Sequence, residues 1–214
     1  MWKRALAPYI KDPIQYSKDE VVFFDEKVVI ITDKFAKSEY HLLVLPRNPF
    51  LTKEHPTIAL QESVKDKLDK YIAIAQDHIY KSYSDKYSLL VGSKWFKDDE
   101  EYRNKEKFIT EFINVGVHSV PSMSNLHIHV ITKDFHSSKM KHKKHYNSFN
   151  TEFFVNWDKL PLKEIPDASY MEKEVIAKSD LICSYCSKNF KNKFSLLKQH
   201  LDEEFNTHFK SLND

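Results

Sequence analysis

Residues 125–135, NLHIHVITKDF, place two histidines one residue apart inside an apolar run. Side chains alternate between the two faces of a β-strand, so every second residue of such a run shares a face. One face then carries the apolar set Leu126, Ile128 and Val130. The opposite face carries the polar set Asn125, His127 and His129. The run therefore predicts a strand that packs on a core with one face and presents two imidazoles together on the other.

These two histidines admit three uses. They could be incidental side chains on a half-solvated strand. They could share a metal ion, as alternate histidines of a strand can, although no third ligand is evident nearby in the sequence. Alternatively, one imidazole attacks a substrate and its neighbour binds the charge that develops. An isolated H-x-H pattern favours the first use, so the surrounding sequence has to decide.

Strand and helix patterns in the first half of the chain have different periods. Residues 21–32 predict two β-rich runs around the polar turn DEK, and residues 39–46 predict a strand that ends at a proline. From Ser63 the apolar residues recur at intervals of three and four, which predicts an amphipathic helix through roughly Lys81.

The second half alternates polar segments with strands. Residues 82–107 are polar and predict a variable surface loop. Residues 108–117 and 125–132 then predict consecutive strands, so the order of strand, strand, helix and further strands indicates an α+β fold. Residues 158–180, with two prolines and many charges, predict a linker or a cover strand.

Composition excludes several classes of protein. The chain has only 2 glycines among 214 residues, too few for a glycine-rich phosphate loop of the P-loop or Rossmann kind. The N-terminal residues lack the apolar core of a signal peptide, and no segment is long and apolar enough to span a membrane. We therefore expect a reducing compartment, cytosol or nucleus. A net charge of +2 is too small to indicate a nucleic-acid partner, so that argument rests on local charge.

Both cysteines of the chain, Cys183 and Cys186, form a C-x2-C pair near its C-terminal end. A redox C-x-x-C would need a helix that starts at the motif, whereas here a helix is expected only from about Phe194. Phe190 and Leu197 stand where a ββα finger has its core residues. The pattern therefore predicts a zinc finger, with His200 as its third ligand.

The fourth zinc ligand is open between Glu204 and His208. On a continuous helix, Glu204 lies one turn beyond His200, on the same face. His208 would lie about 12 Å from His200 along the axis, too far for bonds to one ion. We therefore expect one zinc ion per chain, held by Cys183, Cys186, His200 and Glu204, with His208 as a ligand only if the helix breaks.

The histidine run and its surroundings resemble a known family. The H-φ-H-φ-φ core, preceded by HSVPSMSN, resembles the histidine triad superfamily of nucleotide hydrolases and transferases. The longer string GVHSVPSMSNLHIHVITKDF, followed by KHKKHYNSFNT, resembles the aprataxin family more narrowly, as do DKFAKSEYHLLVLPR and the C-terminal finger. Within that family, the chain resembles fungal aprataxin-like proteins in particular. The resemblance covers Trp2 to about Phe209, except residues 82–107.

Asn125 departs from the superfamily pattern, which has a histidine at this outermost of three positions. The position is not that of the nucleophile, and asparagine can still orient a neighbour by hydrogen bonding. The chain therefore lacks one of the three histidines after which the superfamily is named, but the expected chemistry is unchanged.

The resemblance implies the domain organisation. A histidine triad nucleotide-hydrolase domain with an N-terminal helix, an antiparallel sheet and packed helices would occupy residues 1–157. A linker or cover segment would follow at 158–180, and a small ββα-like zinc finger at 181–214. The zinc would be structural, and the chemical step would need no metal.

The resemblance also assigns three catalytic histidines. His127 would attack the α-phosphorus of an adenylate and form a histidyl–AMP intermediate. Imidazole suits this role because it is nucleophilic while neutral near pH 7. His129 would hold a non-bridging oxygen, and His118 would assist the leaving group.

Six further residues would bind the substrate by the same resemblance. Asp33 would bond the ribose hydroxyls, His41 would line the nucleotide pocket, and Trp2 would stack on a DNA end. The phosphate-contacting residues would be Ser122, Lys141 and His145.

The residues alone leave alternatives open for several of these assignments. His41 could equally be a satisfied core histidine, and an exposed N-terminal Trp2 could simply cover a core edge. The run KMKHKKHY at 139–146 could be a solvated basic loop. Within it, Lys143 and Lys144 are interpreted as charges that steer the backbone of DNA.

The function that the resemblance implies is a DNA-repair hydrolase. It would remove AMP from 5′-adenylated DNA ends left by aborted ligation, and also 3′ guanylate caps. We expect a nuclear or cytoplasmic monomer that binds nicked or ended duplex DNA. One alternative is a general histidine triad hydrolase of dinucleotides or phosphoramidates, against which the finger and basic run argue. The other is a non-catalytic zinc-finger nucleic-acid-binding protein. The joint presence of the assigned catalytic and phosphate-contacting residues argues against it, namely His118, Ser122, His127, His129, Lys141 and His145.

Overall fold

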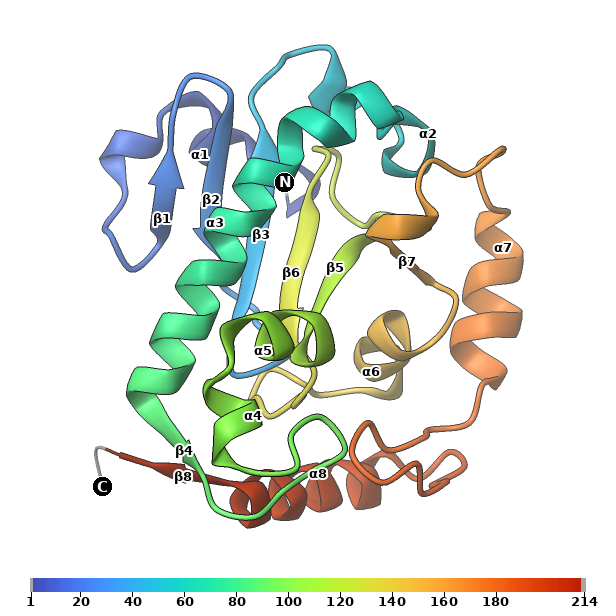
Figure 1. The fold of residues 1–214 in the computed structure, drawn as a ribbon. Coiled ribbons are helices and arrows are strands. Elements are labelled where there is room, and N and C mark those ends of the chain that lie inside the picture. Colours follow the sequence, from blue (N-terminus) through green and yellow to red (C-terminus); the bar gives the residue numbers. More distant parts are fainter. Residues whose placement is uncertain (1, 213–214) are drawn as a thin grey trace.

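The computed structural model describes residues 2–212, with the side chain of Trp2 outside that description. Its centre is a six-stranded antiparallel sheet in the order β1-β2-β3-β6-β5-β7 (Figure 1). The expected strands in residues 21–32 and 39–46 are confirmed, as is the strand that carries His129. The strands are β1 (Val21–Phe24), β2 (Val28–Thr32), β3 (His41–Pro46), β5 (Ile113–His118), β6 (Ile128–Thr132) and β7 (Phe154–Asn156).

Both faces of this sheet are covered, which explains why its central strands are almost continuously apolar. One face packs on α3 (Glu62–Lys86), the amphipathic helix that its periodicity predicts, which extends one turn beyond the expected end. On the opposite face, η1 (Trp2–Arg4) and α1 (Ala7–Lys11) flank Leu6, which packs against Val29 and Leu43. Alternate residues of β2 and β3 therefore enter two separate cores.

The register of the sheet brings distant histidines to one face. On neighbouring strands, Leu43 of β3 and Gly116 of β5 both lie opposite His129 of β6. Because residues two apart share a face, His41 on β3 and His118 on β5 lie on the same face as His129. Three histidines from three adjacent strands thereby meet.

Residues 82–107 are not a surface loop, contrary to the sequence-based expectation. The helix α3 runs to Lys86, and β4 (Tyr87–Leu89), α4 (Asp99–Arg103) and α5 (Lys105–Phe112) follow. Three rings of the segment are buried in a cluster with rings of α5, because burial of large aromatic surface outweighs the many charges around them. These rings are Trp95, Phe96 and Tyr102.

The expected strand at 108–117 is only half correct. Its first residues end α5, and the strand β5 begins at Ile113. Phe108 and Phe112 are four residues apart, so in a helix they lie on one face and both enter the aromatic cluster.

Residues 158–180 are largely helical and contain no cover strand. The short α7 (Ala168–Tyr170) continues into the π-helical η5 (Met171–Ile176), which packs against α6 (Lys143–Asn150). The apolar side chains of η5 form a small core with Phe153. The remaining short helices are η2 (Pro13–Gln15), η3 (Leu51–Lys53), α2 (Pro56–Ala59) and η4 (Trp157–Lys159).

The C-terminal finger is packed onto the main domain. Its helix α8 (Phe194–His208) starts where the sequence predicts, and β8 (Phe209–Ser211) pairs antiparallel with β4. Figure 1 shows α8 lying across the lower end of the molecule, next to β4 and β8. Phe205 and Phe209 join the aromatic cluster of the main domain. Within residues 2–212, no helix has the length and apolar character needed to cross a bilayer.

Candidate functional site

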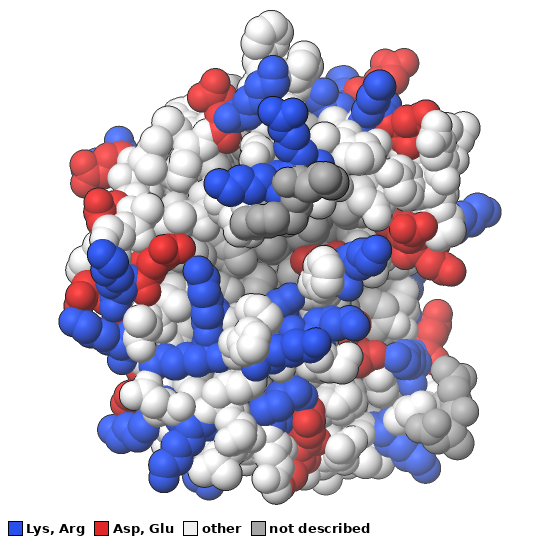
Figure 2. Space-filling view, turned by 180° about the vertical axis from the view of Figure 1, so that it is seen from behind, with Lys and Arg blue, Asp and Glu red and all other residues white. Residues whose placement is uncertain are grey.

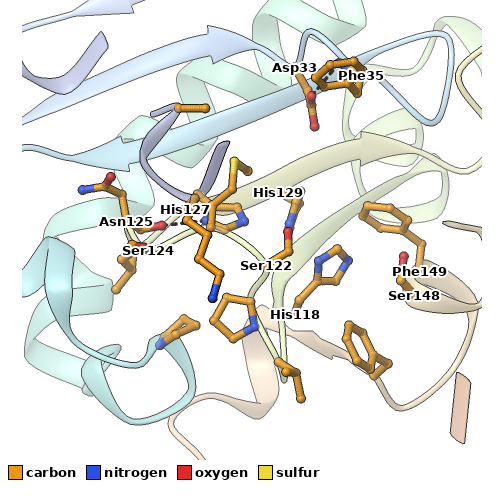
Figure 3. Close-up of a pocket in the computed structure, with 18 of the residues that line it drawn as sticks. Asp33, Phe35, His118, Ser122, Ser124, Asn125, His127, His129, Ser148 and Phe149 are labelled. Carbon is orange, nitrogen blue, oxygen red and sulfur yellow. Dashed lines mark hydrogen bonds between the residues drawn. The ribbon is translucent and has the colours of Figure 1, made fainter. Parts of the chain in front are cut away.

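A cavity of about 910 Å³ opens on the histidine-bearing face of the sheet (Figure 3). Its walls come from the loop after β2, the segment between η3 and α2, the loop between β5 and β6, and α6. The histidines His41, His118, His127 and His129 form its floor. A cavity of this size with a few convergent polar groups is typical of a small-molecule or nucleotide site.

His127 and His129 are each only 3 % exposed, so the interpretation as a half-solvated strand is wrong. The Nδ1 atom of His127 lies 2.7 Å from the main-chain carbonyl oxygen of Asn125. A carbonyl can only accept, so Nδ1 carries the proton and the lone pair is on Nε2. Burial lowers the pKa of His127, which keeps the ring neutral near pH 7. A neutral ring with a free Nε2 lone pair is a nucleophile.

A chain of polar contacts runs from His129 to an acid. Nδ1 of His129 lies 2.8 Å from Nε2 of His41, and Nδ1 of His41 lies 3.3 Å from Oδ2 of Asp33. Burial lowers the pKa of His129 well below its usual range and that of His41 to about 4. His41 is therefore neither solvated nor a plain core residue, because its two nitrogens link the cavity floor to the acid.

The group Asp33, His41 and His129 also has ligand atoms within 4.8 Å of one another, which the sequence did not reveal. His127 is not part of this group, so a metal shared by the H-x-H pair is not what the geometry supports. Within the group, the direct contact between His41 and His129 would have to break for an ion to enter between those two rings.

His118 stacks at the back of the cavity. Its ring lies 4.4 Å from that of His129 and 4.7 Å from that of Phe149, measured between centroids. Burial and the neighbouring His127 hold the pKa of His118 well below its usual range. Among the described residues, Nε2 of His118 and Nε2 of His129 have no hydrogen-bond partner. Buried polar atoms are normally paired, so these two indicate groups that a ligand completes.

The loop before β6 forms one rim of the cavity. Ser122 is exposed on this rim, and Figure 3 shows it between His127 and His118 in the view. Asn125, at the position where the superfamily has a histidine, donates from Nδ2 to Oγ1 of Thr52 at 3.2 Å. Its side chain thus fastens the rim to η3.

The basic run around α6 divides into different roles. His145 lines the cavity, and the main-chain N–H of Lys141 donates to its Nδ1 at 3.2 Å. The side chain of Lys141 itself is exposed and lies outside the cavity lining. Lys143 bonds Asn192 and the carbonyl of Ala177, so it joins the C-terminal segments and is not a free steering charge.

Four lysines that no motif singled out for the pocket line its walls: Lys3, Lys37, Lys53 and Lys144. Lys144, interpreted from sequence as a steering charge, lies in the lining and pairs with Glu172 at 3.2 Å. Figure 2, which views the molecule from behind, shows Lys and Arg side chains gathered around a hollow. Lys3, Lys37 and Lys53 are scattered along the chain and Lys144 stands in the basic run, so only the fold could reveal that all four line one cavity. The predicted stacking by Trp2 falls on a side chain outside the described residues.

The finger brings four candidate ligands together. One ligand atom each from Cys183, Cys186, His200 and Glu204 lies within 4.8 Å of all the others. Nε2 of His200 is 3.2 Å from Sγ of Cys186 and 3.0 Å from Oε1 of Glu204. Two thiols, an imidazole and a carboxylate fit tetrahedral zinc. The helix α8 is unbroken to His208, which is the condition under which Glu204 is preferred.

Comparison with known proteins supports the assignment of both the histidine-bearing domain and the C-terminal zinc finger. The family model described as "HIT domain" matches residues 15–136, and that described as "C2HE / C2H2 / C2HC zinc-binding finger" matches residues 150–207. The "Aprataxin-like protein" of Saccharomyces cerevisiae is 48% identical over 213 residues, covering 97% of this chain and 98% of that one. The "Aprataxin-like protein" of Schizosaccharomyces pombe is 33% identical, covering 94% and 80%.

Solved structures are similar over the same extent. The "Crystal structure of aprataxin ortholog Hnt3 in complex with DNA" superposes with a TM-score of 0.77 at 29% identity, covering 96% of each chain. The structure described as "Hnt3 in complex with DNA and guanosine" has a TM-score of 0.73 at 30% identity, with the same coverage. The similarity therefore includes the sheet, the cavity walls and the finger.

Proposed function

The chain belongs to the aprataxin family, and we propose that it removes AMP from 5′-adenylated DNA. This family joins a histidine triad domain to a zinc finger and acts in DNA repair as a hydrolase. The observation that carries the proposal is the fixed ring of His127. Its Nδ1–H is held by a main-chain carbonyl, its pKa is lowered, and its Nε2 faces a cavity of nucleotide size.

In the first step, the lone pair on Nε2 of His127 attacks the α-phosphorus of the adenylate. A P–N bond forms, and the bond from that phosphorus to the DNA 5′-phosphate oxygen breaks, with the electron pair leaving on the oxygen. His118 donates the proton that this oxygen takes up. The pKa of His118 is low in the free pocket, so its proton is stabilised only when the negative charge of the substrate is bound beside it.

His129 stabilises charge on a non-bridging oxygen. When Nε2–H of His41 donates to Nδ1 of His129, the proton of His129 lies on Nε2, the atom without a protein partner. The main-chain N–H of Lys37, 3.4 Å from Nδ1 of His41, supports this tautomer, and in the proposal the carboxylate of Asp33 beside that nitrogen binds the ribose hydroxyls. A preset donor of this kind costs no reorganisation in the transition state.

In the second step, water attacks the same phosphorus and gives its proton to His118. The P–N bond breaks, its electron pair returns to Nε2 of His127, and AMP is released. All protein groups in this scheme, side chain or main chain, belong to residues that line the cavity. We propose that the zinc is structural, because four protein ligands leave no open position for substrate.

DNA as the substrate is supported by charge around the cavity and by the relatives. Lys3, Lys37, Lys53 and Lys144 line the walls, and Ser122 and His145 are available for phosphate. Relatives have been solved in complexes with DNA and with guanosine. We extend the proposal to 3′ guanylate caps and to a nuclear location on the same grounds.

Turnover of a 5′-adenylated nicked duplex tests the proposal directly. We expect release of AMP and a religatable 5′-phosphate, with much slower cleavage of a free dinucleotide such as diadenosine tetraphosphate. The reverse order would favour the general histidine triad hydrolase. Tight binding of the duplex without any AMP release would favour the non-catalytic binding protein.

A further inference from the structure

His208 stands at the junction between the finger and the main domain. It is the last residue of α8, and its carbonyl accepts from the N–H of Leu90 just before β8 pairs with β4. Its imidazole is mostly buried and stacks on Tyr185, with the ring planes 7° apart. The ring is therefore held from several sides.

The two ring nitrogens of His208 contact two different acceptors. Nδ1 lies 3.0 Å from the carbonyl oxygen of Val91, and because a carbonyl only accepts, this nitrogen is a donor. Nε2 lies 3.3 Å from Oε2 of Glu204, which also only accepts, so the ring holds both partners in its doubly protonated form. One imidazole thus connects the segment after β4 to the finger.

Glu204 divides its two oxygens between two histidines. Oε1 is 3.0 Å from Nε2 of His200, within the group of zinc ligands, whereas Oε2 faces His208. A carboxylate that offers one oxygen to a metal needs its other oxygen held, since outer partners orient the ligand and strengthen binding. His208 is too far along the helix to be a ligand but is placed to do this.

We propose that His208 is a positioning residue for zinc. It holds Oε2 of Glu204 so that Oε1 faces the ion, and it anchors that arrangement to the main chain at Val91. The inference rests on zinc occupying the four-ligand group, and it is independent of the chemistry at His127. The proposal also gives the zinc a role in docking the finger, because the ring of His208 contacts both Glu204, a candidate zinc ligand, and Val91 of the main domain.

Three substitutions separate the two contacts. His208→Ala removes both. His208→Gln keeps a donor near the position of Nε2, and His208→Asn keeps one near the position of Nδ1. Gln199→Ala, an exposed position on the same helix that bonds Glu203, is the matched control. Zinc affinity of each full-length protein is measured by competition with a fluorescent zinc chelator, together with thermal unfolding of the zinc-loaded protein.

We expect His208→Ala and His208→Asn to weaken zinc binding about 10-fold or more, the size of effect typical of outer partners of a ligand. His208→Gln should retain affinity close to that of the control. A His208→Ala protein that binds zinc within a factor of about two of wild type would overturn the proposal, given that scale. Equal losses in Gln and Asn would also overturn it, since the effect would then come from the helix end and not from Glu204. If the Ala variant does not fold, the Gln and Asn pair decides.

Discussion

The ring of His127 is oriented by the main chain of Asn125, at 2.7 Å from Nδ1 to the carbonyl oxygen. The residue that departs from the superfamily pattern therefore sets the tautomer of His127 through its backbone carbonyl, which every residue type supplies. Its side chain is used elsewhere, on Thr52. The pattern can lose its outermost histidine without losing a free lone pair on Nε2.

Replacing His127 with Ala should abolish AMP release and leave DNA affinity nearly unchanged, because the ring supplies the attacking atom and not the phosphate contacts. Turnover of a 5′-adenylated nick and binding by fluorescence anisotropy measure the two effects. His78→Ala, a histidine on α3 outside the cavity lining, is the control. Turnover above a few per cent of wild type in the His127 variant would contradict the assignment.

His118→Ala should slow formation of the histidyl–AMP adduct about 100-fold or more, the usual range for a lost general acid. A substrate with an activated leaving group should be partly rescued, since it needs no proton. Rapid-quench single-turnover assays with both substrates make the comparison. If both substrates slow equally, His118 only positions the phosphates.

Stability should fall in mild acid because the pocket histidines are buried in the neutral form. The pKa of His41 is lowered to about 4 from an ordinary 6.5. Above 6.5 both folded and unfolded chains hold this ring neutral, so its contribution is complete. Between 6.5 and 4 only the unfolded chain takes up the proton, and about 3 kcal/mol of stability is lost as the pH decreases.

Urea unfolding of the His41→Asn variant at several pH values checks this linkage. The free energy of unfolding of the wild type should decrease from pH 6.5 to pH 4 more steeply than that of the variant. Zinc loss in acid affects both proteins alike, so the difference between them isolates His41. Parallel pH dependences would show that His41 does not contribute.

Affinity for nicked DNA should fall steeply with salt, because lysines around the cavity replace counterions on phosphates. Each contact contributes roughly −0.9 to the slope of log affinity against log salt concentration. Lys53→Gln should reduce the magnitude of the slope by about one, and Lys97→Gln, which is not in the cavity lining, should not change it. A DNA affinity that is flat between low and moderate salt would remove the electrostatic part of the proposal.

Glu204→Ala should cause greater zinc loss than any change at His208, because it removes a ligand and not a partner of one. X-ray absorption of the wild type should report two sulfurs, one nitrogen and one oxygen around the ion. The unfolding temperature of Glu204→Ala should decrease, with Glu203→Ala, exposed on the same helix, as the control. A shell of two sulfurs and two nitrogens would mean that His208 and not Glu204 is the ligand.

Local spacing was sufficient for several features of this chain. The alternation at 125–132 predicted the strand β6, although β6 begins only at Ile128 and His127 directly precedes it, and the three-four periodicity from Ser63 predicted α3. The spacing of four between His200 and Glu204 predicted which acid would join the cysteines. In each case the deciding contacts follow from the period of one helix or strand, so neighbouring residues carry the information.

Other features depend on segments that meet only in the fold. From sequence, the aromatic rings at 95–102 were predicted to lie in a polar surface loop. In the fold they are buried by contacts with Phe108, Phe112 and Phe209. His41 meets His129 across 88 residues, and His208 meets Val91 across 117. Burial and partner choice at such positions depend on what another part of the chain brings to them, and local periodicity carries no information about that. The sequence by itself therefore determined the position of the H-x-H pair and of the four candidate zinc ligands, whereas the tertiary structure decided how each is held in place.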